Sequence, residues 1–255
     1  MELHFKRSGE GRPLVILHGL FGMGDNWATM SKYYAQEGFD VIVPDLRNHG
    51  RSPHSDEFNY DLMAEDIRQL ILSQGLEGAS IIGHSMGGKV AMCFAAKFPE
   101  LIYRLIVVDI GTKYYPPHHQ TVFAAINSIP PASLSNRKEA EEILRNSLKE
   151  EDTIQFLLKN LYWNENEKLD WRFYLKGIEN NIEEVGKALP EEYRINIPTL
   201  FVSGERSGYI QKGDEVVIKK QFNDVNFITI PSAGHWVHAE NPEDFFSETL
   251  SFLKL

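Results

Sequence analysis

The residue pattern best suited to chemistry is the pentapeptide Gly83-His84-Ser85-Met86-Gly87. It lies between an apolar run, Ile81-Ile82, and a helical pattern that continues to Phe98. A nucleophilic serine needs this order of strand, tight turn and helix, with small residues beside it. We therefore predict that Ser85 is a nucleophile. A serine hydroxyl is unreactive at its own pKa, so a base must lie nearby.

The predicted base is His235, one of nine histidines. It follows the last apolar run of the chain, so its loop is expected at the same sheet edge as Ser85. The local alternative is His238, which falls on the segment leading to the final helix. Three others are interpreted as structural, His18, His49 and His84, and four have no partner suggested by the sequence, His4, His54, His118 and His119.

The elements around these residues alternate between short apolar runs and helical patterns. Short runs that end in Gly, Pro or Asp are typical of strands buried on both faces of a parallel sheet. Apolar residues at helical spacing occur in three segments. The first follows Asn59 or Asp61, the second runs from Ser85 to Pro99, and the third begins at Asn241-Pro242. This pattern predicts an α/β fold with a doubly wound, mostly parallel sheet. The six runs are Leu14–Leu17, Val41–Val43, Ile81-Ile82, Leu105–Val108, Thr199–Val202 and Phe227–Ile230.

The segment 114–193 breaks this alternation, because it contains helical patterns and no strand-like run. We predict a helical cap inserted between two late strands of a core formed by residues 1–113 and 194–255. The cap either adds packing or forms a lid over a pocket at the carboxyl edge of the sheet. Its three apolar stripes are Ala140, Ile143, Leu144 and Leu148; Leu157, Leu158, Leu161 and Tyr162; and Leu175, Ile178, Ile182 and Val185.

Composition excludes several classes of protein. With 26 basic and 36 acidic residues among 255, a net charge of −10 and no Lys/Arg run, a nucleic-acid partner is not expected. One cysteine, Cys93, rules out an internal disulfide and is interpreted as a small core residue. No apolar run approaches the roughly 20 residues of a spanning helix, and the residues after Met1 lack a signal-peptide pattern. We expect a soluble, cytoplasmic protein that does not bind a membrane.

No cofactor is expected. The sequence has no metal-ligand spacing of His, Cys and Asp, and no glycine-rich phosphate loop after a strand. The charged residues Asp45, Arg47 and Arg51 are interpreted as structural, held by ion pairs within their own loop.

Four segments resemble the α/β-hydrolase fold family in their order and spacing. The first two look like the small YbfF-type esterase branch, whose members are carboxylester hydrolases and acyl-thioesterases with a short helical cap. The resemblance covers the whole chain except the inserted helices. The segments are His18-Gly19-Leu20-Phe21-Gly22, Asp45-Leu46-Arg47-Asn48-His49-Gly50-Arg51-Ser52, Gly83–Gly87 and Gly234-His235.

The resemblance implies an acid that orients the histidine, and here the sequence departs from the commonest pattern. Most such hydrolases have an acid after the strand that follows the cap, where this chain has Ser207. In the resembled branch the acid comes earlier, in an Asp-Ile pair that matches Asp109-Ile110. We predict Asp109, with Glu205 as the alternative; Asp214 comes late in the loop.

The oxyanion of the reaction needs two backbone amides. The residue after the nucleophile, Met86, supplies one. The resemblance implies Leu20 as the second, with Phe21 as the alternative. The predicted reaction is two-step acyl transfer from a small-molecule ester, or a thioester, through an acyl-serine.

The aromatic residues of the cap bear on the choice of substrate. We expect most of them to be packing residues and the remainder to line an apolar acyl pocket for aliphatic or aryl esters of short to medium length. The cap holds 14 acidic and 9 basic residues, which favours uncharged esters over acyl-coenzyme A. The aromatic residues are Tyr114, Tyr115, Phe123, Phe156, Tyr162, Trp163, Trp171, Phe173 and Tyr174.

Other activities use the same fold. A C–C bond hydrolase, a lyase or a cofactor-free haloperoxidase can employ the same serine and histidine. A non-catalytic ligand receptor is the alternative outside enzymes. Dehalogenases and epoxide hydrolases are disfavoured, because their nucleophile is a carboxylate and here it is Ser85.

Overall fold

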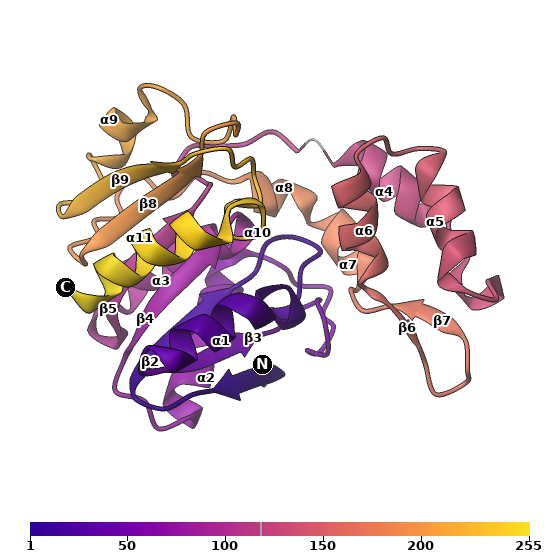
Figure 1. Cartoon of the computed structure of the whole chain (residues 1–255), viewed down its shortest axis with the longest axis horizontal. Helices are drawn as coiled ribbons and strands as arrows, with labels where there is room; N and C mark the ends of the chain where they lie inside the picture. Colours follow the sequence, from indigo (N-terminus) through magenta and orange to yellow (C-terminus); the bar gives the residue numbers. More distant parts are fainter. Residues whose placement is uncertain (118) are drawn as a thin grey trace.

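A mostly parallel sheet forms the centre of the computed structural model, which describes residues 1–117 and 119–255 (Figure 1). Over these residues the sheet has seven strands in the order β1-β3-β2-β4-β5-β8-β9, and only β1 runs antiparallel to its neighbour. His118 lies outside the described residues. The strands are β1 (Phe5–Ser8), β2 (Arg12–Leu17), β3 (Phe39–Pro44), β4 (Ala79–His84), β5 (Ile102–Val108), β8 (Thr199–Gly204) and β9 (Val225–Ile230).

The six apolar runs of the sequence all lie in strands, which confirms the predicted doubly wound α/β fold. Every residue of β3 and β4 is buried, as expected for strands covered on both faces. Strand β1 was not predicted from the sequence. This four-residue edge strand is half exposed and charged, so it carries no run of buried apolar residues.

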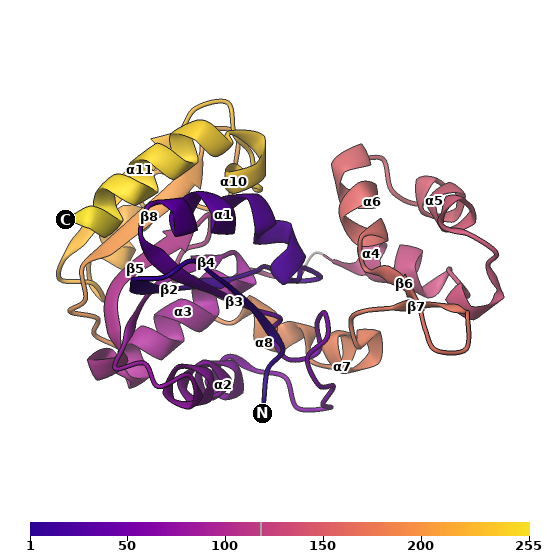
Figure 2. The ribbon, with the colours of Figure 1, turned by 60° about the horizontal axis from the view of Figure 1, so that its bottom comes forward.

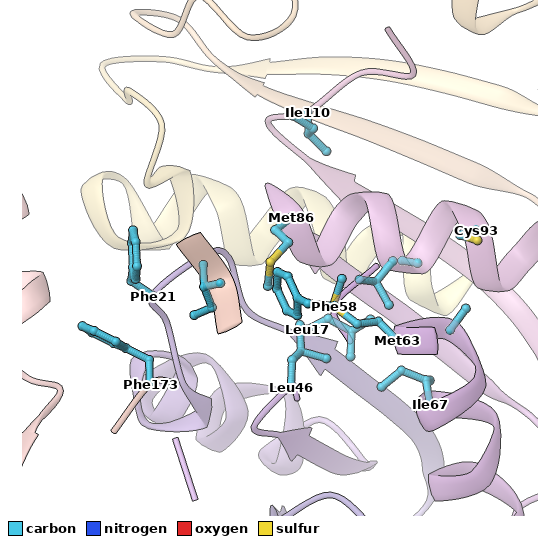
Figure 3. Close-up of a cluster of buried hydrophobic side chains, with 14 of the residues drawn as sticks. Leu17, Phe21, Leu46, Phe58, Met63, Ile67, Met86, Cys93, Ile110 and Phe173 are labelled. Atoms are coloured by element: carbon cyan, nitrogen blue, oxygen red, sulfur yellow. The ribbon is translucent and has the colours of Figure 1, made fainter. Parts of the chain in front are cut away.

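Helices cover both faces of the sheet (Figure 2). On one face α1 (Ala28–Gln36) and α11 (Pro242–Lys254) enclose a core around Trp27, Tyr34 and Phe245. On the other face lie α2 (Tyr60–Ser73) and α3 (Met86–Lys97), and Figure 3 shows Phe58, Met63 and Met86 packed among them. Two short helices, α9 (Asp214–Ile218) and α10 (Val237–Glu240), complete the C-terminal part.

Helix starts follow the expected caps. The side chain of Asn59 accepts the Leu62 amide at 2.9 Å and begins α2, and Asn241 accepts the Asp244 amide at 3.3 Å and begins α11. No helix in residues 1–117 or 119–255 is long and apolar enough to cross a membrane.

The segment between β5 and β8 projects to one side of the sheet (Figure 1). It contains five α-helices and a short 3₁₀ helix (Pro131–Ser133) in its described part, together with a hairpin of two short strands that pair antiparallel. The elements are α4 (Gln120–Asn127), α5 (Arg137–Arg145), α6 (Glu151–Leu158), β6 (Leu161–Trp163), β7 (Leu169–Trp171), α7 (Leu175–Asn180) and α8 (Ile182–Gly186).

The hairpin corrects the expectation that this segment has no strand. Leu161 and Tyr162 do not continue the helical stripe of Leu157 and Leu158, because α6 ends at Leu158. A turn closed by the Glu167 amide on the Asn164 carbonyl, at 3.0 Å, then reverses the chain. Strands of three residues are too short to show an alternating pattern.

The charged residues near the start of the chain are structural, but their partners differ from the prediction. Arg47 is buried and pairs with Asp66 of α2 at 2.7 Å instead of with a residue of its own loop. Asp45 accepts backbone amides, including that of Arg51 at 2.8 Å. Cys93 is buried in the core, as predicted.

Candidate active site

Ser85 lies in a tight turn between β4 and α3. Its backbone φ of 53° and ψ of −119° are unusual for a residue with a side chain and cost about 1–3 kcal/mol. The turn is held by the Ser85 amide, which donates to the Val108 carbonyl at 2.9 Å. A Cβ on Gly83 would lie 2.3 Å from the Gly87 carbonyl oxygen, and one on Gly87 would lie 2.5 Å from the Leu17 carbonyl oxygen. The two glycines of the pentapeptide are therefore required by close approach of the backbone.

His235 lies in the loop between β9 and α10, beside Ser85. Its Nε2 is 3.0 Å from Ser85 Oγ, and its Nδ1 is 2.7 Å from Asp109 Oδ2. Because a carboxylate only accepts, the Nδ1 proton points to Asp109 and leaves Nε2 free to accept the Ser85 proton. The ring of Tyr209 stacks on that of His235 at 4.1 Å, which fixes its plane.

Asp109 follows β5 directly and is completely buried. Besides His235, its carboxylate accepts the Gly204 amide at 3.3 Å and the hydroxyl of Ser207. Glu205 instead accepts the Ser232 amide at 2.8 Å.

Asp214 pairs with Lys113 at 2.6 Å. Of the three carboxylates considered from the sequence, Asp109 is thus the one that contacts His235. The hydrogen bonds from Gly204, the last residue of β8, and from Ser207 were not predicted, because the order of residues there does not reveal them.

The loop of Leu20 lies against the serine turn. A Cβ on Gly19 would come within 3.3 Å of Ser85 Cβ, and Leu20 and Met86 both line a cavity with Ser85. The amide of Phe21, the alternative to Leu20, donates to His49 Nε2 at 3.1 Å and is therefore occupied.

Two cavities meet at Ser85. The larger, about 600 Å³, is lined on one side by His235, Trp236 and His238 and on the other by residues of α6 such as Phe156. The smaller, about 40 Å³, is mainly apolar and lies on the side of Met86. Its other lining residues include Ile110, Tyr115, Ile182 and Val185.

Some aromatic residues of the segment between β5 and β8 pack in the core, and others line the two cavities. Phe123, Trp171 and Phe173 are buried in the core, whereas Phe156 and Tyr115 line the cavities.

Four further histidines lie around the site in neutral form. His84 donates through Nε2 to the His235 carbonyl at 2.8 Å, and burial lowers its pKa well below the usual value. Burial likewise lowers the pKa of His238, which stacks on Trp27 at 3.9 Å, to about 3.

His18 and His49 fix loops, as predicted. His18 Nε2 accepts the Leu46 amide at 2.9 Å, and its Nδ1 lies 2.8 Å from the Gly19 carbonyl. His49 Nδ1 lies 2.9 Å from the Arg47 carbonyl. Burial lowers the pKa of both rings, that of His49 to about 3. Among the described residues, no group of three or more His, Cys, Asp and Glu is placed to hold a metal ion.

Comparisons with known proteins agree with this architecture. The family model of the alpha/beta hydrolase fold matches residues 12–242. An sn-1-specific diacylglycerol lipase of Danio rerio is 39% identical over 258 residues, which cover 98% of this chain and 81% of that protein. Esterase YbfF of Escherichia coli is 35% identical over 234 residues, which cover 91% and 89%. A solved structure described as a marine microorganism esterase is 42% identical, covers 99% of both chains and has a TM-score of 0.96.

Proposed function

Because this chain belongs to the α/β-hydrolase fold family, we propose that it is a serine hydrolase that cleaves carboxylic esters through an acyl-serine intermediate. The observation that carries the proposal is the chain of hydrogen bonds from Ser85 Oγ through His235 to the buried Asp109. Relatives described as esterases and lipases support the same class of reaction.

In the proposed reaction Ser85 is the nucleophile and His235 the base. As the Ser85 Oγ–carbon bond forms, its proton passes to His235 Nε2. His235 then gives this proton to the leaving alcohol while the ester bond breaks. In the second step His235 takes a proton from water, which attacks the acyl-serine, and returns it to Ser85 Oγ as the acid is released. Asp109 holds the Nδ1 tautomer and stabilises the charged imidazolium.

The amides of Leu20 and Met86 are proposed to bind the oxyanion. Both residues lie beside Ser85, and Met86 is the first residue of α3, whose N-terminal amides have no partner within the helix. A donor of this kind is worth about 10²–10³ in kcat.

The two cavities suggest how an ester would lie. The leaving oxygen must reach His235 for its proton, so the alcohol group belongs in the larger cavity, which His235 lines. The acyl group is then directed to the smaller cavity beside Met86, whose 40 Å³ corresponds to about three water molecules. We propose a short acyl group, of about two to four carbons, on a larger apolar alcohol. A thioester of the same shape would fit equally well.

We further propose that residues 114–193 act as a cap on the core of residues 1–113 and 194–255. Residues of α6 and of the segment around Tyr115 supply walls of the two cavities. The cap thereby determines which esters can reach Ser85.

A p-nitrophenyl ester series from acetate to dodecanoate tests this function. We expect kcat/KM to be highest between acetate and butyrate and to fall with longer chains. We also expect a fluorophosphonate to label Ser85, as read by peptide mass, and Ser85→Ala to abolish both labelling and turnover. Turnover that survives Ser85→Ala would disprove the mechanism, and a maximum at long chains would disprove the assignment of the cavities.

A further inference from the structure

The loop that carries Leu20 has a strained backbone, and residues from other parts of the chain hold it in place. Residues 19–22 form a turn in which the Gly22 amide donates to the Gly19 carbonyl at 2.9 Å. Within it Phe21 has a φ of 58°, in the left-handed region that costs a residue with a side chain about 1–2 kcal/mol. Such a conformation persists only where the surroundings fix it.

Four contacts fix Phe21, and three come from the inserted segment. The core supplies His49, which accepts the Phe21 amide at 3.1 Å. The insertion supplies Asn160, whose Nδ2 donates to the Phe21 carbonyl at 2.8 Å. The rings of Phe123 and Phe173 pack edge-on against that of Phe21, with centroids 5.5 and 5.2 Å away, and Figure 3 shows Phe173 beside Phe21.

Asn160 is itself rigidly placed. It lies two residues beyond the end of α6 and is only 1% exposed. Its amide donates to the Leu157 carbonyl at 2.9 Å, and its carbonyl accepts the Arg172 amide at 2.9 Å. The side-chain nitrogen must face Phe21, because two carbonyl oxygens would repel each other. The cap therefore presents a fixed donor to the loop beside Ser85.

We propose that Asn160 is a positioning residue for ester cleavage, orienting the Phe21–Gly22 peptide and, through it, the neighbouring Leu20 amide toward the oxyanion. This inference rests on the proposed function. A Leu20 amide turned out of line would no longer stabilise the charge that develops in the transition state, while ground-state contacts in the cavities would persist. Loss of the Asn160 donor is therefore expected to lower kcat and to leave KM nearly unchanged.

The test compares Asn160→Leu and Asn160→Asp with Asn127→Leu on p-nitrophenyl acetate. Asn127 is the matched control, because it also lies in the insertion but is exposed and donates to Glu179. We expect kcat to fall by about 10-fold or more in both Asn160 variants, short of the 10²–10³ of a lost oxyanion donor. KM is expected to stay within about two-fold, and Asn127→Leu to match the wild type.

Two inhibitors separate orientation from general damage. A trifluoromethyl ketone adds to Ser85 and places an oxyanion where the transition state has one, whereas the matched methyl ketone imitates only the bound ester. The affinity for the trifluoromethyl ketone should fall by the same factor as kcat/KM, and that for the methyl ketone should not change.

An equal loss of affinity for both ketones would overturn the inference. A kcat within two-fold of wild type in a folded Asn160 variant would overturn it as well. If Asn160→Leu fails to fold, the nearly isosteric Asn160→Asp decides. Wild-type protein without Ser85-dependent esterase activity would instead overturn the proposed function, and the inference with it.

Discussion

At the scale of single residues, the hydrogen bonds to Asp109 after β5 involve the end of β8 and the loop that follows it. A buried carboxylate needs several hydrogen bonds to remain charged. Asp109 receives them from His235, from the Gly204 amide and from the Ser207 hydroxyl. The family resemblance leads us to expect an acid at the position of Ser207, and here the Ser207 hydroxyl donates to Asp109 instead. An aspartate at position 207 would repel the Asp109 carboxylate, whereas a serine there can donate a hydrogen bond to it.

The first prediction concerns Asp109→Asn. An amide at this position no longer holds His235 in the required tautomer, and by analogy with a serine protease kcat should fall by about 10⁴. Stopped-flow or long-time-course hydrolysis of p-nitrophenyl acetate measures the loss. The control is Glu205→Gln, which should keep kcat, because Glu205 contacts the Ser232 amide and not His235. Near-normal turnover in Asp109→Asn together with a loss in Glu205→Gln would show that the acid is Glu205.

Part of this site could be predicted from the sequence. Ser85 and His235 stand in short motifs whose neighbours reveal the turn and the sheet edge. Asp109 and Glu205 remained alternatives, because both follow strands whose carboxyl ends meet at one edge. The partners of Phe21 could not be predicted, since Asn160 lies 139 positions away and no local pattern marks a contact across that separation.

At the scale of elements, the two segments that connect the insertion to the core lie side by side. The Leu189 amide donates to the Thr112 carbonyl and the Tyr115 amide to the Gly186 carbonyl, both at 2.8 Å. Lys89 of α3 contacts both of these connecting segments. Its buried Nζ donates to the carbonyls of Lys113 at 2.7 Å and Lys187 at 3.0 Å. Lys89 thus joins the first and last parts of the insertion to α3, the helix that begins directly after Ser85.

Lys89→Met should loosen this junction without unfolding the protein. Below pH 7, where Lys89 is charged, its hydrogen bonds contribute about 1.5–3 kcal/mol each, so their loss should make local opening at least about 10-fold more frequent. Burial lowers the pKa of Lys89 to about 7, because removing the ammonium from water is unfavourable. This desolvation offsets part of the stabilisation by the two hydrogen bonds. Global stability should therefore change less than local opening.

Hydrogen exchange at the Tyr115 and Leu189 amides measures that opening. The control is Lys97→Met on the same helix, where the ammonium pairs with Asp61 at 2.8 Å instead of with the carbonyls of Lys113 and Lys187. Unchanged exchange at both amides in Lys89→Met would show that Lys89 does not hold the junction.

Most elements were predictable because burial on both faces leaves a run of apolar residues. Strands β2 to β5, β8 and β9 all have such runs, and α2 and α11 have recognisable caps. The strands that were not predicted are the edge strand β1 and the hairpin of β6 and β7, and the helices α1, α4, α9 and α10 were not predicted either. The missed strands have no long apolar run. They are three or four residues long, and their pairing depends on a neighbour that a linear pattern does not show.

At the scale of the whole molecule, the carboxyl edge of the sheet gathers neutral histidines. His84 and His238 lie behind His235, with ring centroids 5.0 Å apart, and His18 and His49 lie under the Leu20 loop, 5.2 Å apart. Burial lowers the pKa of all four. Each remains uncharged in the folded protein at a pH where the same side chain would take up a proton in the unfolded chain.

This difference makes stability depend on pH in a known direction. Unfolded histidine titrates near pH 6.5, whereas folded His49 and His238 titrate near 3, so between these values the unfolded chain binds more protons. The free energy of unfolding should then rise with pH across this window and be lost as the pH falls below 6.5, with a slope of about 1.4 kcal/mol per pH unit for each such histidine.

His238→Phe should reduce by one the number of protons that the chain takes up on unfolding, while it keeps an aromatic ring against Trp27. Urea unfolding at intervals between pH 4.5 and 6 is expected to show a slope lower by about 1.4 kcal/mol per pH unit than in the wild type. Carboxylates titrate mainly below this range and contribute little to the difference. Between pH 7 and 8 the two proteins should have parallel profiles, which is the internal control, because His238 is neutral in both the folded and the unfolded chain. Identical slopes between pH 4.5 and 6 would mean that His238 takes up its proton without unfolding, and that this histidine does not make the fold sensitive to acid.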